Sequence, residues 1–398
     1  MATAKGWIAY VGPFRFPWGE PGSRRVLGVA RSLASAGYEV VVGSGESEPA
    51  TPMPLSDAEG AGEVWHVGLG ERSGAADSPL SKALHLVVSL GRRTVRWLAE
   101  QPTNPAAVIV YGGGVQYAGR LERWCRRNRV PLVADVVEWY APHQLWGGAL
   151  GPVHLSAKLA LHHYYPRCQG IIAISSLLER HYQARGCHVL RVPPTTDVLN
   201  IKPGERLRDP GESGVNVVYF GTPGRKDLLA PIVRAAGVVS RTAPLTLSVY
   251  GPSVDQVRDL VGHGALSSSV RVPGRVPQQE MKDVVGRADF SIVVRPSARF
   301  THAGFPTKLV ESLACGTPVI VNLTSDIGRY LRDGLEGLVC ADASQAELER
   351  VLVRAALLPA SERLAMRAVA RATAEAAFDH RRYSAPLAAF LESMPAVR

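Results

Sequence analysis

The fold is decided by the stretch Phe305-Pro-Thr-Lys-Leu-Val-Glu-Ser-Leu-Ala-Cys-Gly-Thr-Pro-Val-Ile-Val-Asn322. Its first part places apolar residues at helical spacing, and its last part is a short continuous run of β-branched residues. Pro306 suits the first turn of a helix, where its missing N–H is not needed, and Gly316 suits a helix end. The stretch therefore predicts a short helix that leads into a buried strand.

The start of this helix is a predicted binding site for an anion. A helix N-terminus offers free backbone N–H groups and a partial positive charge, both of which attract phosphate. Lys308 and Glu311 lie one turn apart on the same face. A cation for phosphate and a carboxylate for a ribose diol would thus lie side by side. The same two residues are equally compatible with an ordinary surface ion pair, which adds little to stability.

Short apolar strands alternate with helical patterns along the chain. Strands are predicted at residues 7–11, 39–42, 64–67, 108–111, 132–134, 171–174 and 189–192, and again at 217–220, 247–250, 269–272, 290–294 and 318–321. Continuous Val and Ile runs separated by helices indicate parallel sheets that are covered on both faces. Two such series predict an α/β protein of two Rossmann-like domains rather than one eight-stranded barrel.

A charged stretch that is rich in Pro and Gly, from Pro193 to Gly214, separates the two series of strands. We therefore predict a first domain at 1–195, a linker at 196–214 and a second domain that begins at 215. A similar polar stretch, Ser44 to Gly62, is predicted to be a mobile surface loop inside the first domain. Ligands of open α/β sheets bind beyond the carboxyl ends of the strands, so the cleft between the domains is the expected active site.

Size and composition narrow the class of protein. The chain has 398 residues, of which 46% are apolar, and this length suggests roughly two or three domains. It contains no run of about 18 apolar residues, so no membrane-spanning helix is expected, and its start resembles a core strand rather than a signal peptide. The five cysteines have no metal-type spacing. Reduced thiols in a cytoplasmic protein are the prediction.

The formal net charge of +10 indicates acidic partners. The densest basic clusters are Gly91–Trp97 and Arg120–Arg129. Both are predicted to form the polar faces of amphipathic helices. A solvated helix face is one interpretation of these clusters, and attraction to an anionic membrane surface is the alternative. Nucleic acid is not an expected partner, because the chain has no helix-turn-helix, zinc or single-strand-binding signature.

A glycine turn, Gly221-Thr-Pro-Gly-Arg-Lys226, follows the first strand of the second domain. Such a turn lets the backbone approach a phosphate, whose charge Arg225 or Lys226 could neutralise. The pattern lacks the Gly-Lys-Ser/Thr ending of a P-loop and differs from the dinucleotide motif G-x-G-x-x-G. A plain tight turn is therefore the alternative.

The first domain has two candidate regions at the carboxyl ends of its strands. The long loop from Pro13 to Arg25 contains Gly19 and Gly22, and loops of this length at strand ends are usually functional or mobile. Asp135-Val-Val-Glu-Trp-Tyr140 ends another strand and is followed by His143. Carboxylates and imidazoles there are candidates for acid–base catalysis or for contacts with sugar hydroxyls. No group of residues has metal-ligand spacing, so no metal site is predicted.

Together these segments resemble a GT-B glycosyltransferase of the retaining, GT4-like type, the family of glycosyl transferases group 1. The similarity extends over nearly the whole chain. Its best parts are Gly304–Ile320, similar to the donor-site helix, and Ser325–Val339, similar to the glycine-rich turn that follows it. Val272–Pro277 resembles the segment that frames the nucleotide base, and 378–383 resembles the start of a final helix. In this fold that helix, here 377–398, crosses back from a donor domain at 215–376 to the first domain.

One position departs from the family pattern. The family often has two glutamates separated by seven residues, of which Glu311 matches the second. The first position is Ala303 here, so the carboxylate that contacts the donor sugar is absent. His302, Arg299 or the backbone near Gly304 could replace it, and the sequence does not choose between them.

The resemblance implies a role for each candidate residue. Catalysis is assigned to Lys226, Lys308, Glu138 and His143, with the two lysines stabilising the diphosphate as the sugar leaves, so that neither a metal nor another cofactor is needed. Donor binding is assigned to Gly221, Thr222, Arg225, Arg275, Val276, Arg295, His302, Gly304, Phe305, Pro306, Thr307 and Glu311, of which Glu311 would bind the ribose. A loop for the acceptor or a phosphate is assigned to Gly19, Gly22 and Ser23.

The expected function is transfer of a hexose-type sugar from a nucleotide-diphosphate sugar to a hydroxyl-bearing acceptor, with retention, in the synthesis of a glycan, a glycolipid or a natural product. The expected partners are the nucleotide sugar and a small acceptor or a lipid-linked glycan, with peripheral membrane contact as an addition. The expected location is the cytoplasm, or the inner face of its membrane. A nucleotide-sugar epimerase on the same fold and an inactive nucleotide-sugar binding partner are the alternatives.

Overall fold

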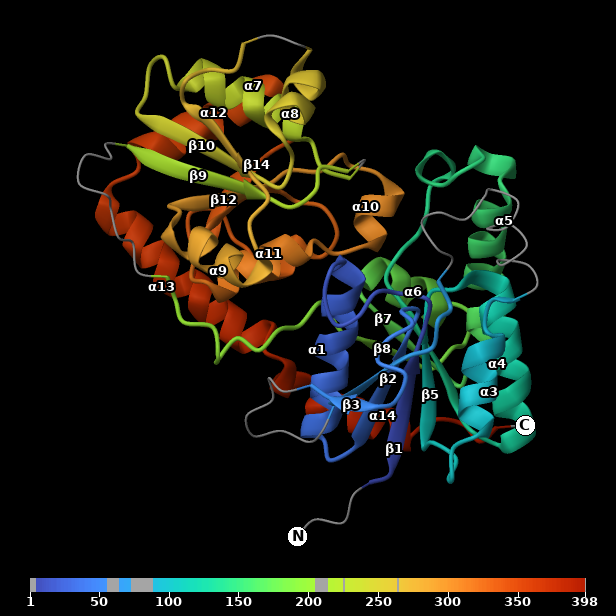
Figure 1. Ribbon diagram of the computed structural model, residues 1–398. Coiled ribbons are helices and arrows are strands. Elements are labelled where there is room, and N and C mark those ends of the chain that lie inside the picture. The colour runs from blue at the N-terminus through green and yellow to red at the C-terminus, as the bar shows by residue number, and fades with distance from the viewer. Residues whose placement is uncertain are drawn as a thin grey trace. The chain divides into compact units, whose positions relative to one another are not determined.

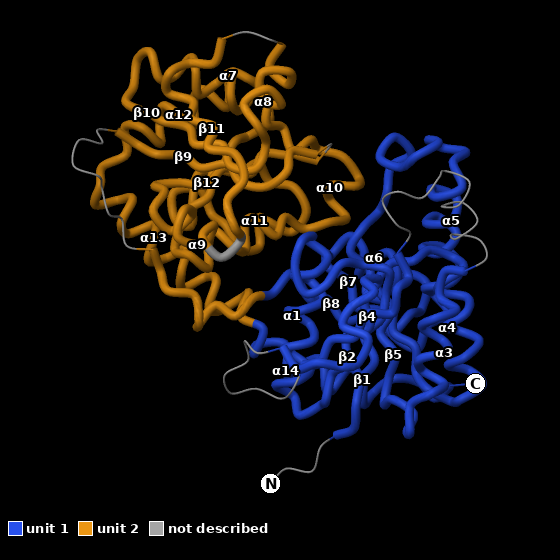
Figure 2. The backbone as a smooth tube through the Cα atoms, viewed as in Figure 1, with its two compact units in different colours: residues 1–195, 380–398 blue, residues 196–379 orange. Residues whose placement is uncertain are grey.

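The computed structural model describes residues 5–55, 64–72, 89–204, 214–224, 226–262 and 265–397. The chain divides into two compact units (Figure 2). Unit 1 contains Met1–Thr195 together with His380–Arg398, and unit 2 contains Thr196–Asp379.

Unit 1 is built on one sheet, in the order β3-β4-β2-β1-β5-β6-β7-β8 (Figure 1). Among the strands that the structure describes here, β3 alone runs antiparallel to its neighbour. The strands are β1 Trp7–Val11, β2 Glu39–Ser44, β3 Met53–Pro54, β4 Val64–Gly68, β5 Ala107–Tyr111, β6 Leu132–Val136, β7 Gly170–Ala173 and β8 Val189–Arg191. The central strands are buried over almost their whole length, as their largely apolar sequences require in a sheet covered on both faces.

Helices cover both faces of this sheet, with α1 on one face and α3 and α4 on the other (Figure 1). The described helices of unit 1 are α1 Pro21–Ser35, α3 Arg92–Ala99, α4 Gly114–Asn128, α5 Pro152–Leu159, α6 Ser176–Gln183 and α14 Ser384–Glu392. Short turns of helix are η2 Pro142–Gln144, η3 Gly148–Leu150, η4 Ala160–Tyr164, η5 Tyr165–Arg167 and η7 His380–Tyr383. The C-terminal α14 packs against α1 and β8, so the end of the chain completes the core of unit 1.

Unit 2 has a parallel sheet in the order β11-β10-β9-β12-β13-β14. Its strands are β9 Val215–Phe220, β10 Leu245–Tyr250, β11 Val270–Gly274, β12 Phe290–Val293, β13 Val319–Asn322 and β14 Gly337–Cys340. Its helices are α7 Leu229–Val239, α8 Val254–Val261, α9 Gln278–Arg287, α10 Arg299–Ala303, α11 Thr307–Ala314, α12 Gln345–Leu357 and α13 Ala360–Ala377, with the short η6 at Ile327–Arg329. The strand order reverses between β9 and β12, and ligands of such sheets bind at this switch point.

The predicted pair of doubly wound α/β units is confirmed. Two of the described strands were not predicted from the sequence. One is β14, whose Gly337 hides the β pattern because it has no side chain. The other is β3, a two-residue strand inside the predicted surface loop 44–62, which is therefore a loop only in part. The last residues of that loop, 56–62, lie outside the described residues.

The predicted linker begins where unit 2 begins, at Thr196. Its described part packs on unit 2, because Arg371 in α13 donates to the carbonyl oxygens of Val198 and Ile201 at 2.9 and 2.8 Å. The backbone N–H of Gly204 donates to the carbonyl of Cys315 at 3.1 Å. These bonds attach residues 198–204 to the helices that follow them in the chain.

Candidate functional site

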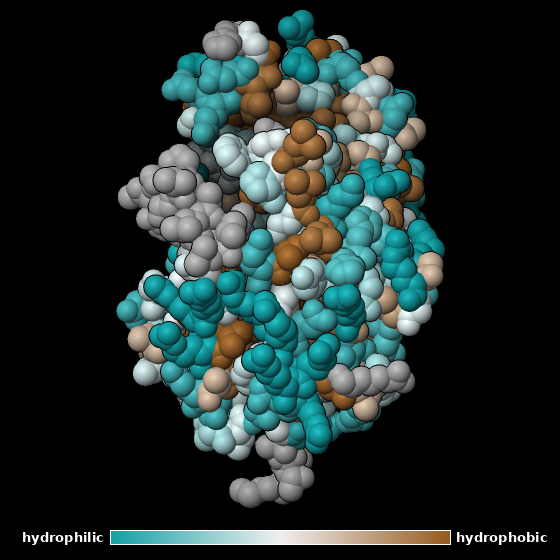
Figure 3. All heavy atoms as spheres, turned by 90° about the vertical axis from the view of Figure 1, so that its right-hand side faces the viewer, coloured by the Kyte–Doolittle hydropathy of each residue, from teal (hydrophilic) through white to brown (hydrophobic). Residues whose placement is uncertain are grey.

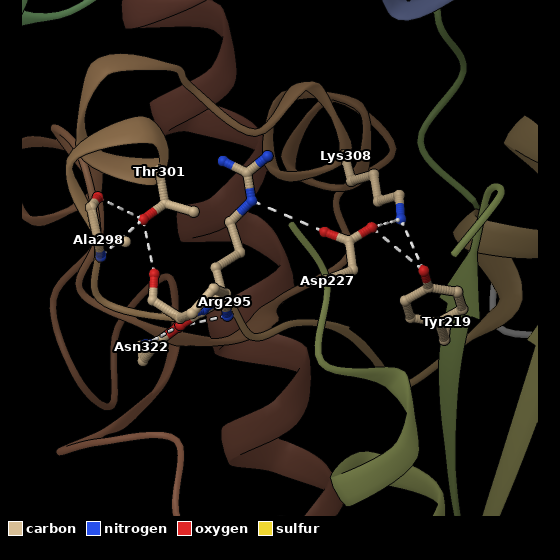
Figure 4. A network of polar contacts seen from close by, with 8 residues as sticks. Tyr219, Asp227, Arg295, Ala298, Thr301, Lys308 and Asn322 are labelled. Atoms are coloured by element: carbon tan, nitrogen blue, oxygen red, sulfur yellow. Dashed lines mark hydrogen bonds and ion pairs between the residues drawn. The ribbon is translucent and has the colours of Figure 1, made fainter. Parts of the chain in front are cut away.

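A network of charges lies at the carboxyl ends of β9 and β12 in unit 2 (Figure 4). Nζ of Lys308 donates to Oδ2 of Asp227 at 2.6 Å and to the hydroxyl of Tyr219 at 3.2 Å. The Tyr219 hydroxyl in turn donates to Oδ2 of Asp227 at 3.2 Å. The ammonium group also lies 4.3 Å from the centroid of the Tyr219 ring, within the range of a cation–π contact. Lys308 is thus held from two sides.

Arg295 is the second cation of this network. Its Nε lies 3.7 Å from Oδ1 of Asp227, which is an ion pair but too long for a hydrogen bond. Its side chain is only 10% exposed, and Nε and Nη1 make no hydrogen bond within the described residues. A buried guanidinium with unused donors is costly unless a ligand completes its hydrogen bonds. Arg295 is therefore the strongest structural indication of an anion site.

The backbone around Arg295 is fixed by neighbouring side chains (Figure 4). Asn322, the last residue of β13, accepts from the N–H of Arg295 at 2.9 Å and donates to its carbonyl at 2.7 Å. Thr301 in α10 donates to the carbonyl of Pro296 at 2.6 Å. These bonds hold the turn that follows β12 and so position the Arg295 side chain.

The charge states of the network follow from its surroundings. Burial would raise the pKa of Asp227, but the positive charges of Lys308 and Arg295 outweigh it and hold the pKa below the ordinary 3.8. Burial and the nearby charge of Asp227 raise the pKa of Tyr219 well above its usual range. At neutral pH the network therefore contains a carboxylate and a neutral phenol that donates to it.

Gly221 is required by the same network. Its φ of +103° lies in a region that favours glycine. A Cβ built on it would also lie 2.8 Å from Cε of Lys308. The glycine that ends β9 therefore leaves room for the lysine that arrives from α11.

Helix α11 begins at Thr307, with Pro306 as its N-cap and no side chain capping its first N–H groups. The predicted helix is confirmed, although Pro306 lies one position before its first turn rather than inside it. Oγ of Ser312 accepts from Oγ of Ser291 in β12 at 2.7 Å, which anchors the helix on the sheet. Glu311, the predicted ribose ligand, lies on this helix and is half-buried.

The remaining predicted donor residues have different surroundings. His302 uses both ring nitrogens, since Nδ1 accepts from the N–H of Ser325 at 3.1 Å and Nε2 lies 3.1 Å from Oγ of Ser297. Its imidazole therefore joins two loops. Ala303 is fully buried. The ring of Phe305 is buried against Tyr330 and Phe378, so Phe305 is a core residue.

The hydrogen bonds and ion pairs given above for the network do not include the other predicted donor residues. Gly304 lies between α10 and α11 and is buried, whereas Thr222 is exposed in the turn after β9. Lys226 is half-buried in that turn, and Arg225 lies outside the described residues. Arg275 and Val276 follow β11, an edge strand that is separated from β9 by β10.

In unit 1, the predicted acceptor loop is closely packed. Ser23, in the first turn of α1, is fully buried, and its hydroxyl donates to the carbonyl of Arg15 at 2.7 Å. A Cβ on Gly22 would lie 2.9 Å from the hydroxyl of Tyr111, whereas Gly19 has a φ of +106° in the loop itself. Glycines are needed at both positions for the loop to adopt this path.

The strand-end carboxylates of unit 1 separate into two kinds. Asp135 is buried and pairs with Arg25 at 2.8 Å, and it also accepts from the hydroxyl of Tyr10. Arg25 also donates to the carbonyl oxygens of Val192 and Pro193. The Arg25–Asp135 pair is therefore structural. Glu138 is half-buried in the segment after β6, and His143 is exposed in η2.

Sequence reasoning missed Asp227 and Tyr219. Asp227 directly follows Lys226 in the glycine turn, and an acidic residue beside a predicted phosphate-binding cation was a signal that could have been used. Tyr219 is one of the alternating residues of a buried strand, where an aromatic ring is normally a core residue. Its role depends on the position of Lys308, 89 residues later.

Comparison with known structures identifies the architecture. The structure of Anabaena HepE in complex with UDP and glucose is similar, with a TM-score of 0.67 and 14% identity over 98% of this chain and 100% of that one. Sucrose-phosphate synthase from Thermosynechococcus elongatus has a TM-score of 0.72 and 13% identity, with 98% of each chain covered. The fold is GT-B.

Sequence comparison finds a similarity to a known family in part of unit 2. Residues 215–356 match the family model of glycosyl transferases group 1. A D-inositol 3-phosphate glycosyltransferase of Actinosynnema mirum is 31% identical over 209 residues, which cover 48% of this chain and 49% of that protein. An amylovoran biosynthesis glycosyltransferase of Erwinia amylovora is 24% identical over 201 residues, with the same coverage. The chain thus spans about half the length of these curated relatives.

The family match contains the whole network of Tyr219, Asp227, Arg295 and Lys308. The matched segment also contains Glu311 and the α11 start. Among the helices that the structure describes, none is both long and apolar enough to cross a membrane.

Proposed function

We propose that this protein is a glycosyltransferase that uses a nucleotide-diphosphate sugar as its donor. The observation that carries the proposal is the buried guanidinium of Arg295, whose unused donors lie beside Lys308 at the switch point of the unit 2 sheet. The match of residues 215–356 to the glycosyl transferases group 1 supports it.

The chemistry of the reaction suits these residues. When the glycosidic bond to the diphosphate breaks, negative charge develops on the leaving phosphate oxygens. Fixed cations in a partly buried site stabilise that charge without reorganisation of solvent. Arg295 and Lys308 supply two such charges, and we infer that Lys226 and Arg225 add to them from the glycine turn. This set would replace a bound metal ion.

Asp227 limits how these cations can act. Its carboxylate already neutralises part of the charge of Lys308 and Arg295, so an anionic donor competes with Asp227 for them. We infer that Asp227 keeps both cations in place before the donor binds. Glu311, one turn after Lys308 on α11, would bind the ribose hydroxyls, because a carboxylate accepts two hydrogen bonds from a diol.

The acceptor and the stereochemistry are further parts of the proposal. We infer that the acceptor carries a hydroxyl group and meets unit 1 near Gly19, Gly22 and Ser23, and near Glu138 and His143. Retention at the anomeric carbon follows from the GT4-like resemblance. We place the protein in the cytoplasm. The curated relatives include phosphatidyl-myo-inositol mannosyltransferases of Mycobacterium, which supports a glycan or lipid acceptor here.

A binding protein without turnover is the second candidate. It is favoured by Ala303, which is fully buried and lies where the family often has the carboxylate for the donor sugar. Both ring nitrogens of His302 already have partners, which argues against its taking the place of that carboxylate.

The test is release of nucleoside diphosphate from a panel of nucleotide sugars, measured with and without hydroxyl acceptors. A glycosyltransferase gives acceptor-dependent release, and a binding protein gives a thermal shift without release. In the active protein, Lys308→Ala is expected to reduce turnover about 100- to 1,000-fold, because one charge-stabilising donor is lost. Lys282→Ala, an exposed lysine of the same unit, is the matched control. A folded Lys308→Ala protein with normal turnover would remove Lys308 from the site.

A further inference from the structure

His302 connects the two turns that follow β12 and β13 in unit 2. Its Nδ1 accepts a hydrogen bond from the backbone N–H of Ser325 at 3.1 Å, and its Nε2 lies 3.1 Å from Oγ of Ser297. Ser297 lies two residues after Arg295, and Ser325 lies three residues after the end of β13. Both turns are at the carboxyl edge of the sheet, beside the switch point where the network of charges lies.

The partners of the imidazole fix which nitrogen carries its proton. A backbone N–H can only donate, so the Nδ1 atom that accepts from Ser325 has no proton. The ring is therefore neutral, with its proton on Nε2, and Nε2 donates to Oγ of Ser297. Of the protonation states of the ring, this one alone fits both contacts.

Ser325 is held in a conformation that serine rarely adopts. Its φ of +56° lies in the left-handed region, which is strained for a residue with a side chain. Hydrophilic side chains on the surface in Figure 3 can complete their hydrogen bonds with water, whereas Oγ of Ser325 is buried and has no hydrogen-bond partner within the described residues. The hydroxyl therefore does not stabilise this conformation, but the bond from the N–H to His302 does. Strained residues that are held by their surroundings cluster at functional sites.

The loop that carries Arg295 depends on the same histidine. The backbone N–H of His302 donates to the carbonyl of Ala298 at 3.0 Å, which closes the end of this loop. At its start, Asn322 holds the backbone of Arg295 from the end of β13 (Figure 4). The side chains of His302 and Asn322 thus fasten the two ends of residues 295–302 to the segment that follows and ends β13.

The direction of the unused Arg295 donors follows from the position of this loop. A diphosphate that binds these donors is therefore sensitive to any shift of residues 295–302. We propose that His302 is a positioning residue for the donor, which holds the Arg295 loop in its binding geometry through the bond to the Ser325 N–H. The inference rests on the proposed function, and it gives His302 a role other than contact with the donor sugar.

Two amide variants separate the two bonds of the imidazole. Oδ1 of asparagine is as many bonds from Cα as Nδ1 of histidine, so His302→Asn keeps an acceptor for the Ser325 N–H. The amide of glutamine is one bond further along, at the level of Nε2. His302→Gln therefore keeps the contact with Ser297 but leaves the Ser325 N–H without its acceptor.

Calorimetry with inorganic pyrophosphate measures the effect, because this probe needs the cations but no nucleoside. We expect His302→Gln to weaken pyrophosphate binding about tenfold, as the loss of one hydrogen bond predicts, and His302→Asn to stay within about threefold of the wild type. Urea unfolding shows that each variant is folded. A merely structural role would shift the unfolding midpoints but would leave the pyrophosphate affinities of the folded variants equal.

Two control variants act on the partners of His302. Ser325→Gly keeps the backbone N–H and removes both the strain and the hydroxyl, so the affinity for pyrophosphate should be retained. Ser297→Ala removes the partner of Nε2 alone and should also retain it. Loss of affinity in Ser325→Gly would overturn the proposal, because the Ser325 hydroxyl rather than the bond to His302 would then be the group that matters.

The protonation of the ring is tested on the protein without any ligand. Nitrogen-15 NMR of the imidazole, assigned by comparison with His302→Asn, should show the proton on Nε2. A proton on Nδ1 would overturn the proposal, since Nδ1 could not then accept from Ser325.

The outcomes also separate this inference from the proposed function. If the wild type binds pyrophosphate and the Asn and Gln variants bind it equally well, the positioning role of His302 is wrong and the donor site stands. If the wild type does not bind pyrophosphate at all, the proposed donor site is wrong, and the role of His302 fails with it.

Discussion

At the level of single residues, the carboxylate of Asp227 organises the candidate site, because it contacts Lys308 at 2.6 Å and lies 3.7 Å from Arg295. All three side chains are largely buried, so removing the negative charge would leave two cations without their counter-charge. The positions of Lys308 and Arg295 therefore depend on a residue that need not touch the donor at all.

Replacing Asp227 by Asn should lower the free energy of unfolding at pH 7 by about 2 kcal/mol, since a charge-assisted hydrogen bond and an ion pair are lost. Because the folded-state pKa is held below 3.8, the stabilisation by Asp227 is present above this pH and is lost as the pH falls through the folded-state value. The difference between wild type and variant should thus shrink below pH 3.8.

Urea unfolding of both proteins at pH 7 and at successively lower pH measures this difference. Asp255→Asn, an exposed carboxylate of the same unit, is the control. A difference for Asp227→Asn that stays constant down to pH 3 would show that the charge of Asp227 does not stabilise the fold.

Glu311 is predicted to bind the donor ribose, and Glu311→Ala should therefore weaken binding of a nucleoside diphosphate. Inorganic pyrophosphate has no ribose, so its affinity should not fall. Calorimetry with both ligands separates the two effects, with Glu280→Ala on α9 as a control for the change in net charge. Equal weakening of both ligands would mean that Glu311 acts on the diphosphate rather than on the sugar of the nucleoside.

At the level of elements, the site is made where the end of β9, the end of β12 and the start of α11 come together. Ser291 and Ser312 bind α11 to β12, and Asn322 at the end of β13 holds the backbone after β12. The glycine turn that follows β9 must then leave space for the side chain of Lys308. Gly221 meets this requirement through its positive φ and its missing Cβ.

Gly221→Ala should therefore destabilise the protein by about 1–3 kcal/mol, since alanine is strained at this φ. It should also displace Lys308 and reduce turnover. Gly224→Ala in the same turn is a matched control, because its φ is not in the glycine-favouring region and a Cβ there would meet nothing within 4 Å. Similar unfolding midpoints and turnover for the two variants would argue against the close contact between the turn and Lys308.

At the level of the whole molecule, the chain has two α/β units of the GT-B type, and its cationic network lies entirely within unit 2. The described network has two cations, Lys308 and Arg295, and one carboxylate, Asp227, and is therefore positive on balance. A metal ion would have to enter a site that already carries the charges of Lys308 and Arg295, which disfavours it electrostatically.

Turnover should consequently persist in excess EDTA. The expected result is the same rate of nucleotide release before and after removal of divalent cations, measured in acceptor-dependent assays. Loss of activity with EDTA, followed by recovery on addition of magnesium or manganese, would contradict a metal-free mechanism.

The sequence by itself determined the layout of the chain. Continuous Val and Ile runs such as those of β2, β5 and β13 need burial on both faces, and this requirement predicts parallel sheets without knowledge of the contacts. The start of the helix at Thr307 and the one-turn separation of Lys308 and Glu311 could also be predicted. Both depend on signals within a few residues, namely a proline and the helical spacing of apolar side chains. β14 was missed, since a glycine and a cysteine at its ends weaken the local pattern.

Only the tertiary structure decided which charges meet. Lys308 and Asp227 are 81 residues apart, and their contact depends on the order in which β9, β12 and β13 enter the sheet. The sequence likewise suggested Asp135 as a candidate site residue. In the structure its carboxylate accepts a hydrogen bond in the core from Arg25, which is 110 residues away in the chain. Local propensity acts over a few residues, whereas the pairing of buried charges is set by packing between distant segments, and that packing is fixed only when the whole unit folds.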